Sequence, residues 1–123
     1  MPSTILIKRV YEDATTGDGL RILVDRLWPR GLTKDAARVD RWMKEVAPST
    51  ALRKWFNHDP DRWPEFQKRY ARELDECAEL VSELVALARQ GDVTLVFGAK
   101  DERHNQAVAL AAYVRRKMKS RRA

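Results

Sequence analysis

The chain has 123 residues, of which 44% are hydrophobic, and this size suits one globular domain without room for a second of ordinary size. No stretch approaches the roughly 18 consecutive apolar residues of a membrane span, and the N-terminus lacks the apolar core of a secretory signal. A single cysteine, Cys77, excludes an internal disulfide and the cysteine clusters of zinc sites, so we expect a cytoplasmic protein with neither a metal nor another cofactor.

The formal net charge of +6 is confined to the C-terminal end of the chain. Residues 115–123, RRKMKSRRA, contain six cations and no acid, whereas residues 1–114 contain 18 basic and 18 acidic groups. We therefore expect one neutral domain, 1–114, and a basic helix end or tail, 115–123. Cations stabilise a helix C-terminus through its dipole. We therefore prefer a helix end to a nucleic-acid-binding tail. Clustered positive charge also permits such a tail, but a tail that binds single strands would carry aromatic residues among its basic ones.

The first third of the chain predicts two extended elements separated by a loop. Residues 4–10, TILIKRV, have the apolar run of a short buried strand, and the glycine-containing segment that follows ends near Gly19. Residues 20–28, LRILVDRLW, predict a second strand that proline and glycine at 29 and 31 end. Alternation places Arg26 on an apolar face of this strand, where its charge needs a partner or access to water.

The middle of the chain predicts short elements with recognisable boundaries. Thr33 is a candidate N-cap for a short helix in TKDAARVD, and Ser49 or Thr50 could cap a helix through ALRKWF. The segment VDRWMKEV, 39–46, fits a strand or a helix about equally, and we choose a strand. Asp59 followed by proline is a further helix-start signal.

A long apolar stripe follows. From residue 66 onward apolar positions recur at steps of four and three, which predicts a helix with one buried face: Phe66, Tyr70, Leu74, Cys77, Val81, Leu84 and Ala88. An unbroken helix over 65–90 would span ~40 Å, longer than the domain is wide, so we expect a break near 76–78. Gly91 is the expected C-cap at the end of the stripe. On this stripe Cys77 is interpreted as a small core residue and not as a reactive thiol.

The end of the chain gives the clearest elements. Residues 92–99, DVTLVFGA, predict a strand, and residues 105–119 predict a helix with one apolar face made by Ala107, Ala111, Val114 and Met118. Strands that alternate with helices favour a small parallel or mixed sheet flanked by helices. The predicted fold is therefore a single compact α/β domain.

The junction between this strand and this helix, LVFGAKDERHN at 95–105, is a candidate site. In open α/β sheets ligands bind beyond the carboxyl ends of the strands, where the first amides of a helix need acceptors. A phosphate or carboxylate would satisfy those amides, and Lys100 would add charge. His104 and Asp101 are the candidates for handling protons, with helix capping as the structural alternative for Asp101, and Asn105 would orient a ligand.

Further cations follow the first two predicted strands. Arg9 ends one strand, and Arg26, Arg30 and Lys34 follow the other, so parallel strands would bring all four to the edge of the sheet that carries residues 100–105. Arginine matches the geometry of phosphates and carboxylates, which favours an acidic ligand. The structural alternative is ion pairing with nearby carboxylates: Asp25, Asp35 and Asp40.

These residues give two hypotheses for function. The first is a pocket for an anionic metabolite, such as a nucleotide or another phosphorylated compound, in a protein whose status as an enzyme stays open. The second is a module that binds nucleic acid or a partner through the basic end at 115–123. Neither hypothesis involves a membrane, and the sequence does not indicate an oligomeric state.

Three segments resemble the YeaO-like family of bacterial and archaeal domains of unknown function: DRLWPRGLTK, WMKEVAPSTALRKWFNHDPDRWPEFQKRYAREL and VTLVFGAKDERHNQAVAL. The resemblance covers nearly the whole chain apart from the basic tail. It implies a compact single-domain α/β fold, and it implies little about activity because the family is best known as uncharacterised. Relatives in a neighbouring branch have a Cys-His-Arg run after the last strand, whereas this chain has His104, Asn105 and Gln106, which argues against thiol chemistry there.

Overall fold

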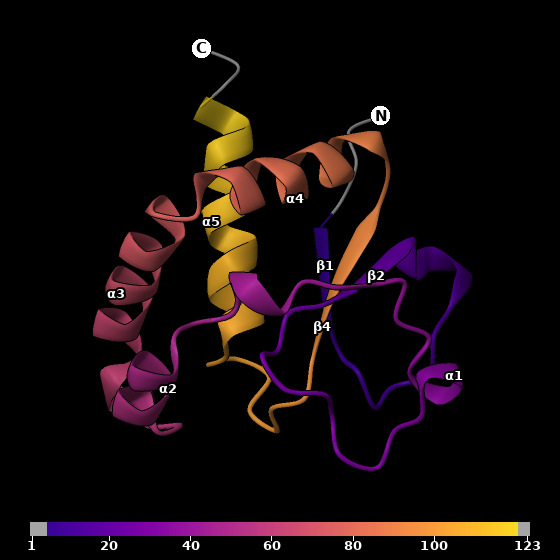
Figure 1. Cartoon of the computed structure of the whole chain (residues 1–123), viewed down its shortest axis with the longest axis horizontal. Coiled ribbons are helices and arrows are strands. Elements are labelled where there is room, and N and C mark those ends of the chain that lie inside the picture. The colour runs from indigo at the N-terminus through magenta and orange to yellow at the C-terminus, as the bar shows by residue number, and fades with distance from the viewer. Residues whose placement is uncertain (1–4, 121–123) are drawn as a thin grey trace.

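A four-stranded parallel sheet forms the centre of the protein in the computed structural model, which describes residues 5–120 (Figure 1). The strand order is β1-β4-β2-β3, and the strands are Ile5–Arg9 (β1), Leu20–Leu23 (β2), Arg41–Trp42 (β3) and Val93–Phe97 (β4). β4 lies between β1 and β2 and pairs with both. The predicted α/β class is confirmed, and the sheet is parallel.

The helices cover the two faces of the sheet unequally. They are Lys34–Ala37 (α1), Thr50–Phe56 (α2), Trp63–Asp75 (α3), Ala78–Gln90 (α4) and Gln106–Ser120 (α5). Ile22 and Leu95 face the main core, which α2 to α5 complete. Leu23 and Val96 face the other way and pack with Ala37 of α1 in a much smaller cluster. In Figure 1, α1 accordingly lies apart from the other helices.

Several predicted boundaries are confirmed. The Thr33 hydroxyl accepts a hydrogen bond from the Ala36 N–H and caps α1, and the Ser49 hydroxyl accepts one from the Leu52 N–H and caps α2. The helix predicted along the apolar stripe is broken near residues 76–78, as expected from its length: α3 ends at Asp75 and α4 begins at Ala78. Cys77 lies in this break and is half-buried.

Two predicted strands are shorter than expected. In the segment 39–46 only Arg41–Trp42 is a strand, and a 3-10 turn follows at Lys44–Val46, closed by a hydrogen bond from the Val46 N–H to the Met43 carbonyl. The element predicted at 20–28 ends at Leu23. Beyond this point one backbone bond continues, from the Val24 N–H to the Val96 carbonyl, and side chains add to it: Arg26 donates to loop carbonyls and Asp25 accepts the Gly98 N–H.

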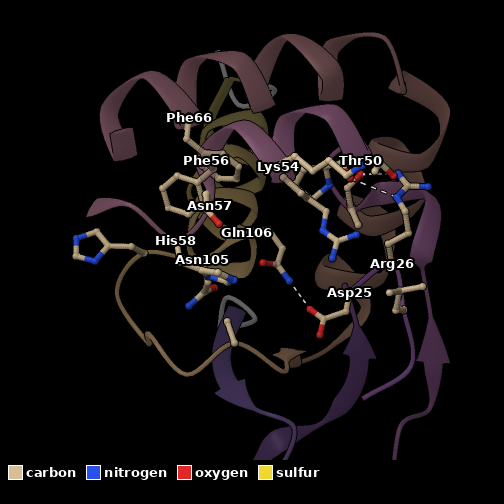
Figure 2. A pocket seen from close by; sticks show the side chains of 16 residues that line it. Asp25, Arg26, Thr50, Lys54, Phe56, Asn57, His58, Phe66, Asn105 and Gln106 are labelled. Atoms are coloured by element: carbon tan, nitrogen blue, oxygen red, sulfur yellow. Dashed lines mark hydrogen bonds between the residues drawn. The ribbon is translucent and has the colours of Figure 1, made fainter. Parts of the chain in front are cut away.

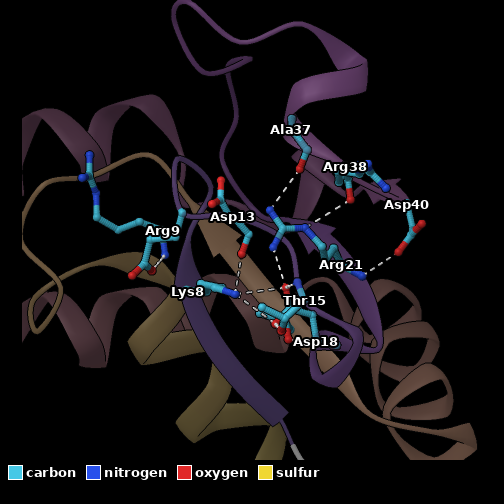
Figure 3. Close-up of polar contacts among 11 residues, drawn as sticks. Lys8, Arg9, Asp13, Thr15, Asp18, Arg21, Ala37, Arg38 and Asp40 are labelled. Atoms are coloured by element: carbon cyan, nitrogen blue, oxygen red, sulfur yellow. Dashed lines mark hydrogen bonds and ion pairs between the residues drawn. The ribbon is translucent and has the colours of Figure 1, made fainter.

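A buried ionic cluster closes the sheet face that has few apolar residues (Figure 3). Asp18 accepts hydrogen bonds from Arg21 Nη1 at 2.7 Å and from Lys8 Nζ at 3.2 Å. Burial acts to raise the pKa of Asp18, but bonds from Thr15, Arg21 and Lys8 outweigh it and hold that pKa well below its usual range. Arg21 also donates to the carbonyls of Ala37 and Arg38. The cluster thereby ties the β1–β2 loop to the segment around α1.

The C-terminal cations begin within α5. Arg115 donates to the Ile5 carbonyl at 2.6 Å, and the charges of Arg116 and Lys117 lie over the ring of Tyr113. This part of the basic segment is a helix end that packs on the domain, while residues 121–123 of the predicted tail lie outside the described residues. In the part of the chain that the structure covers, no helix has the length and apolar character needed to cross a bilayer.

Replacement of Gly19 tests the close approach at the start of β2. The φ angle of Gly19 is 63°, and a Cβ there would lie 2.2 Å from the backbone oxygen of Asp92. We expect Gly19→Ala to lower the free energy of unfolding by about 2 kcal/mol or more in urea denaturation, because neither backbone segment can yield cheaply. Gly91→Ala is the control, since its φ is extended and nothing lies within 4 Å of the added carbon. Equal losses in the two variants would contradict the assignment.

Candidate functional site

A pocket of about 370 Å³ opens beyond the carboxyl ends of β2 and β4 (Figure 2). Its walls come from segments that are distant in sequence but meet at this edge of the sheet. They are the loop after β2 (Asp25, Arg26, Leu27), the segment that contains α2 (Ala47, Pro48, Thr50, Arg53, Lys54, Phe56, Asn57, His58), Phe66 of α3, and the approach to α5 (Ala99, His104, Asn105, Gln106).

The Asp25 carboxylate links three parts of the chain at this edge of the sheet. Its Oδ2 accepts the Gly98 N–H at 2.8 Å, and its Oδ1 accepts a hydrogen bond from Gln106 Nε2. The ends of β2 and β4 and the first turn of α5 are therefore held by one side chain. The contact also explains the glycine that follows β4, because a Cβ at Gly98 would lie 3.0 Å from Asp25 Oδ2.

Burial raises the pKa of Asp25 to about 6, from an ordinary value of 3.8. The Gly98 N–H, the positive charge of Arg53 and the bond from Gln106 all act in the opposite direction and only partly offset burial. Asp25 consequently changes its charge in the weakly acidic range. Titratable groups with shifted pKa values in clefts are candidates for function.

Three cations line the same pocket. Arg26 is half-buried and donates to the carbonyls of Ala47 at 3.0 Å and Pro48 at 3.3 Å. Arg53 and Lys54 lie on α2 and are exposed. Within residues 5–120, no side-chain hydrogen bond or ion pair engages the Arg53 guanidinium or the Lys54 ammonium. The pocket therefore combines three positive charges with one carboxylate, Asp25.

The loop that follows Gly98 is organised by Asp101. This carboxylate accepts the N–H groups of Arg103 at 2.9 Å and His104 at 3.0 Å, and its Oδ2 lies 2.9 Å from His104 Nδ1. These bonds, the Arg103 N–H foremost, lower the pKa of Asp101. The His104 ring also stands edge-on to Trp63, with centroids 5.5 Å apart. A proton on Nδ1 shared with Asp101 would leave Nε2 of His104 as the basic nitrogen.

Asn105 caps α5. Its Oδ1 accepts the Val108 N–H at 3.1 Å, its Nδ2 donates to the Asp101 carbonyl at 2.9 Å, and the residue is only 2% exposed. The helix consequently begins at Gln106, one residue after the start predicted from the sequence. Asn105 lies in the pocket wall with each of its two polar atoms already in one hydrogen bond.

The structure brings together only part of the predicted site. Arg26, His104 and Asn105 line the pocket, whereas the other predicted residues are absent from its lining: Arg9, Arg30, Lys34, Lys100 and Asp101. The Arg9 guanidinium turns to the carbonyls of Ala99 and Gly98, and the segment with Arg30 and Lys34 runs away from the pocket toward α1 (Figure 1). Lys100 is exposed on the loop.

Sequence reasoning missed seven polar residues of the pocket: Asp25, Thr50, Arg53, Lys54, Asn57, His58 and Gln106. A usable signal existed for Asp25, which closely follows a buried strand but was interpreted as an ion-pair partner for arginines. No local signal marked Arg53 and Lys54, because their place depends on α2 returning to the carboxyl edge of the sheet. The hydrogen bond of Gln106 to Asp25 spans 81 positions and leaves no trace in the local sequence.

Comparison with known proteins places the chain in a family. A family model described as the inactive DUF488-N3 subclade matches residues 4–123. An uncharacterised protein of Mycobacterium tuberculosis, Rv3073c, is 45% identical over 107 residues, which cover 87% of this chain and 90% of the relative. The uncharacterised protein YeaO of Escherichia coli is 41% identical over 111 residues, which cover 90% of this chain and 96% of YeaO. No solved structure matches. The predicted resemblance is confirmed: the chain belongs to this YeaO-like family of domains of unknown function.

Proposed function

We propose that this protein binds a small anionic metabolite, one that carries a phosphate or a carboxylate, in the pocket at the carboxyl edge of the sheet, and that it does so in the cytoplasm. The observation that carries the proposal is the pair Arg53 and Lys54, whose side chains line the pocket without a hydrogen bond or an ion pair among the described residues. Arg26 adds a third charge, held in place by two carbonyls. An acidic ligand would supply the partner that these cations lack.

The position of the pocket supports the same proposal. It lies beyond the carboxyl ends of parallel strands, where open α/β sheets bind ligands. Gln106, the first residue of α5, also lines it, so the positive end of this helix dipole adds to the attraction for an anion. By contrast, the buried Arg21 is neutralised by Asp18 and has no comparable role.

Proton transfer is a second candidate function of this pocket. The observation that favours it is the Asp101 contact to His104 Nδ1 at 2.9 Å, which would orient the imidazole as a general base. The description of the matched family as inactive agrees better with binding alone. Turnover of a bound ligand that His104→Gln abolishes without loss of affinity would favour the catalytic role.

The alternative partner for the basic C-terminal segment is nucleic acid. In the described part of this segment, Arg115 bonds to a backbone carbonyl and Arg116 and Lys117 pack on Tyr113. These contacts support a structural role for the helix end, and we therefore favour the pocket as the binding site.

Neutral replacements on α2 test the proposal directly. We expect Arg53→Gln with Lys54→Gln to weaken binding of a sugar phosphate or a dicarboxylate by about tenfold or more, since bonds to charged groups contribute ~1.5 kcal/mol or more each. Calorimetry gives the affinity, and a thermal shift should show ~2.7 kcal/mol of added stability at a hundredfold the Kd. Lys68→Gln with Arg72→Gln is the matched control, because it removes the same charge from exposed positions of α3 outside the pocket. Equal effects of the two pairs would sink the proposal.

The pKa of Asp25 predicts how the stability of the free protein depends on pH. Because the folded pKa of about 6 exceeds the ordinary 3.8, the folded state holds this proton more tightly than the unfolded chain. The resulting stabilisation is complete below about pH 3.8 and is lost as the pH rises through about 6. We expect urea denaturation to show wild type losing more stability than Asp25→Asn between pH 4.5 and 7.5. Parallel stability curves would contradict this assignment of the titrating group.

A further inference from the structure

We propose that the anionic ligand is a nucleoside monophosphate, with its phosphate at the basic end of the pocket, its ribose in the polar middle and its base at the aromatic end. This inference rests on the proposed function and adds the ligand class to it. It follows from the way in which the lining residues are segregated along the pocket.

The two ends of the pocket differ in chemistry, as Figure 2 shows. Arg26, Thr50 and Lys54 lie on one side, and the rings of Phe56, Phe66 and His58 lie on the other. Asp25 and Gln106 are seen between them, joined by their hydrogen bond. A ligand that used only the basic end would leave the exposed ring of His58 in contact with water.

The basic end suits a single phosphate group. A phosphate monoester carries about −1.5 to −2 charges at neutral pH, which the three cations Arg26, Arg53 and Lys54 can balance. The exposed residue Thr50 offers a hydroxyl beside them. The volume of about 370 Å³ is near the lower limit of ligand pockets, roughly 300 to 1,000 Å³, which favours a mononucleotide over a dinucleotide.

The aromatic end is a packed cluster in which His58 and His104 are the more exposed rings. Phe56 and Phe66 stack with ring centroids 4.4 Å apart and are 6% and 2% exposed, so their positions are fixed by packing. The exposed His58 ring lies 6.5 Å from that of Phe56, and the half-buried ring of His104 is held by Trp63 and Asp101. Nucleic-acid bases stack on histidine rings, and each stacked base contributes substantially to affinity, so these two histidines are the rings that a base would meet.

The middle of the pocket offers hydrogen bonds that suit ribose hydroxyls. Among residues 5–120, no hydrogen bond uses the Gln106 side-chain oxygen or the Asn57 side-chain amide. Asn57 ends α2 in the left-handed conformation, with φ of 47°, and lies beside Phe56. The Gln106 oxygen therefore remains available in the middle of the pocket, and the Asn57 amide at the border of the aromatic end.

Calorimetry with matched probes tests the ligand class: AMP, GMP, CMP and UMP against ribose 5-phosphate, adenosine and inorganic phosphate. We expect at least one of the four nucleotides to bind about tenfold or more tightly than ribose 5-phosphate, from stacking of its base, and adenosine to bind weakly because it lacks the phosphate. If ribose 5-phosphate binds as tightly as every nucleotide, the inference is overturned and the proposed anion site stands. If none of the phosphate compounds binds, the inference is overturned, and the proposed function is overturned with it only if a dicarboxylate also fails to bind.

Two variants separate the ends of the pocket. His58→Asn should reduce the affinity of the preferred nucleotide toward that of ribose 5-phosphate and leave ribose 5-phosphate binding unchanged. The fold should tolerate it, because His58 has φ of 55° and asparagine adopts this conformation readily. Lys54→Gln should weaken both ligands by the same factor. A His58→Asn variant that binds every probe as wild type does would remove the base from the aromatic end and overturn the inference.

Discussion

The architecture of the pocket depends on one carboxylate that bonds across two parallel strands. Asp25 leaves β2 where its regular pairing stops and accepts a hydrogen bond from Gly98 just beyond β4. Gln106, at the start of α5, donates a hydrogen bond to the other oxygen of the same carboxylate. Backbone pairing alone would let these segments diverge after the strands end. The side chain keeps them together, and the loop carrying Asp101 and His104 is thereby held beside α2.

The protein uses its cations in two ways that the structure separates clearly. Arg21 and Lys8 form ion pairs with Asp18, and Arg9 and Arg115 donate hydrogen bonds to backbone carbonyls. The Asp18 cluster holds loops together on the sheet face that few apolar residues cover, and Arg9 and Arg115 fix chain segments at the ends of β4 and β1. Arg53 and Lys54 make no hydrogen bond or ion pair within the described residues, although the charge of Arg53 acts on Asp25. A cation that holds no part of the fold in place is better evidence for a ligand than a count of arginines.

The sequence predicted the elements well and the site only in part, for a physical reason. Caps such as Thr33 and Ser49 and the stripe interrupted near Cys77 are local signals, and the structure agrees with them. To predict which cations meet in the pocket, the route of each loop must be known. Hydrophobic periodicity does not give this route. Arg30 and Lys34 follow the same strand as Arg26, yet the chain carries them toward α1. This helix packs on the opposite face of the sheet from α2 to α5. Arg53 and Lys54 came into the pocket from a helix whose direction no local pattern fixes.

The strand order also has a consequence for how the chain can assemble. Because β4 lies between β1 and β2, β1 has no strand to pair with, and β2 has only the two-residue β3, until residues 93–97 have been synthesised. Ile5 meets Val93 across 88 positions, so the sheet depends on contacts of high sequence separation, which slow folding. In a chain emerging from the ribosome, the four-stranded sheet would therefore be completed only late in synthesis, when β4 enters between β1 and β2.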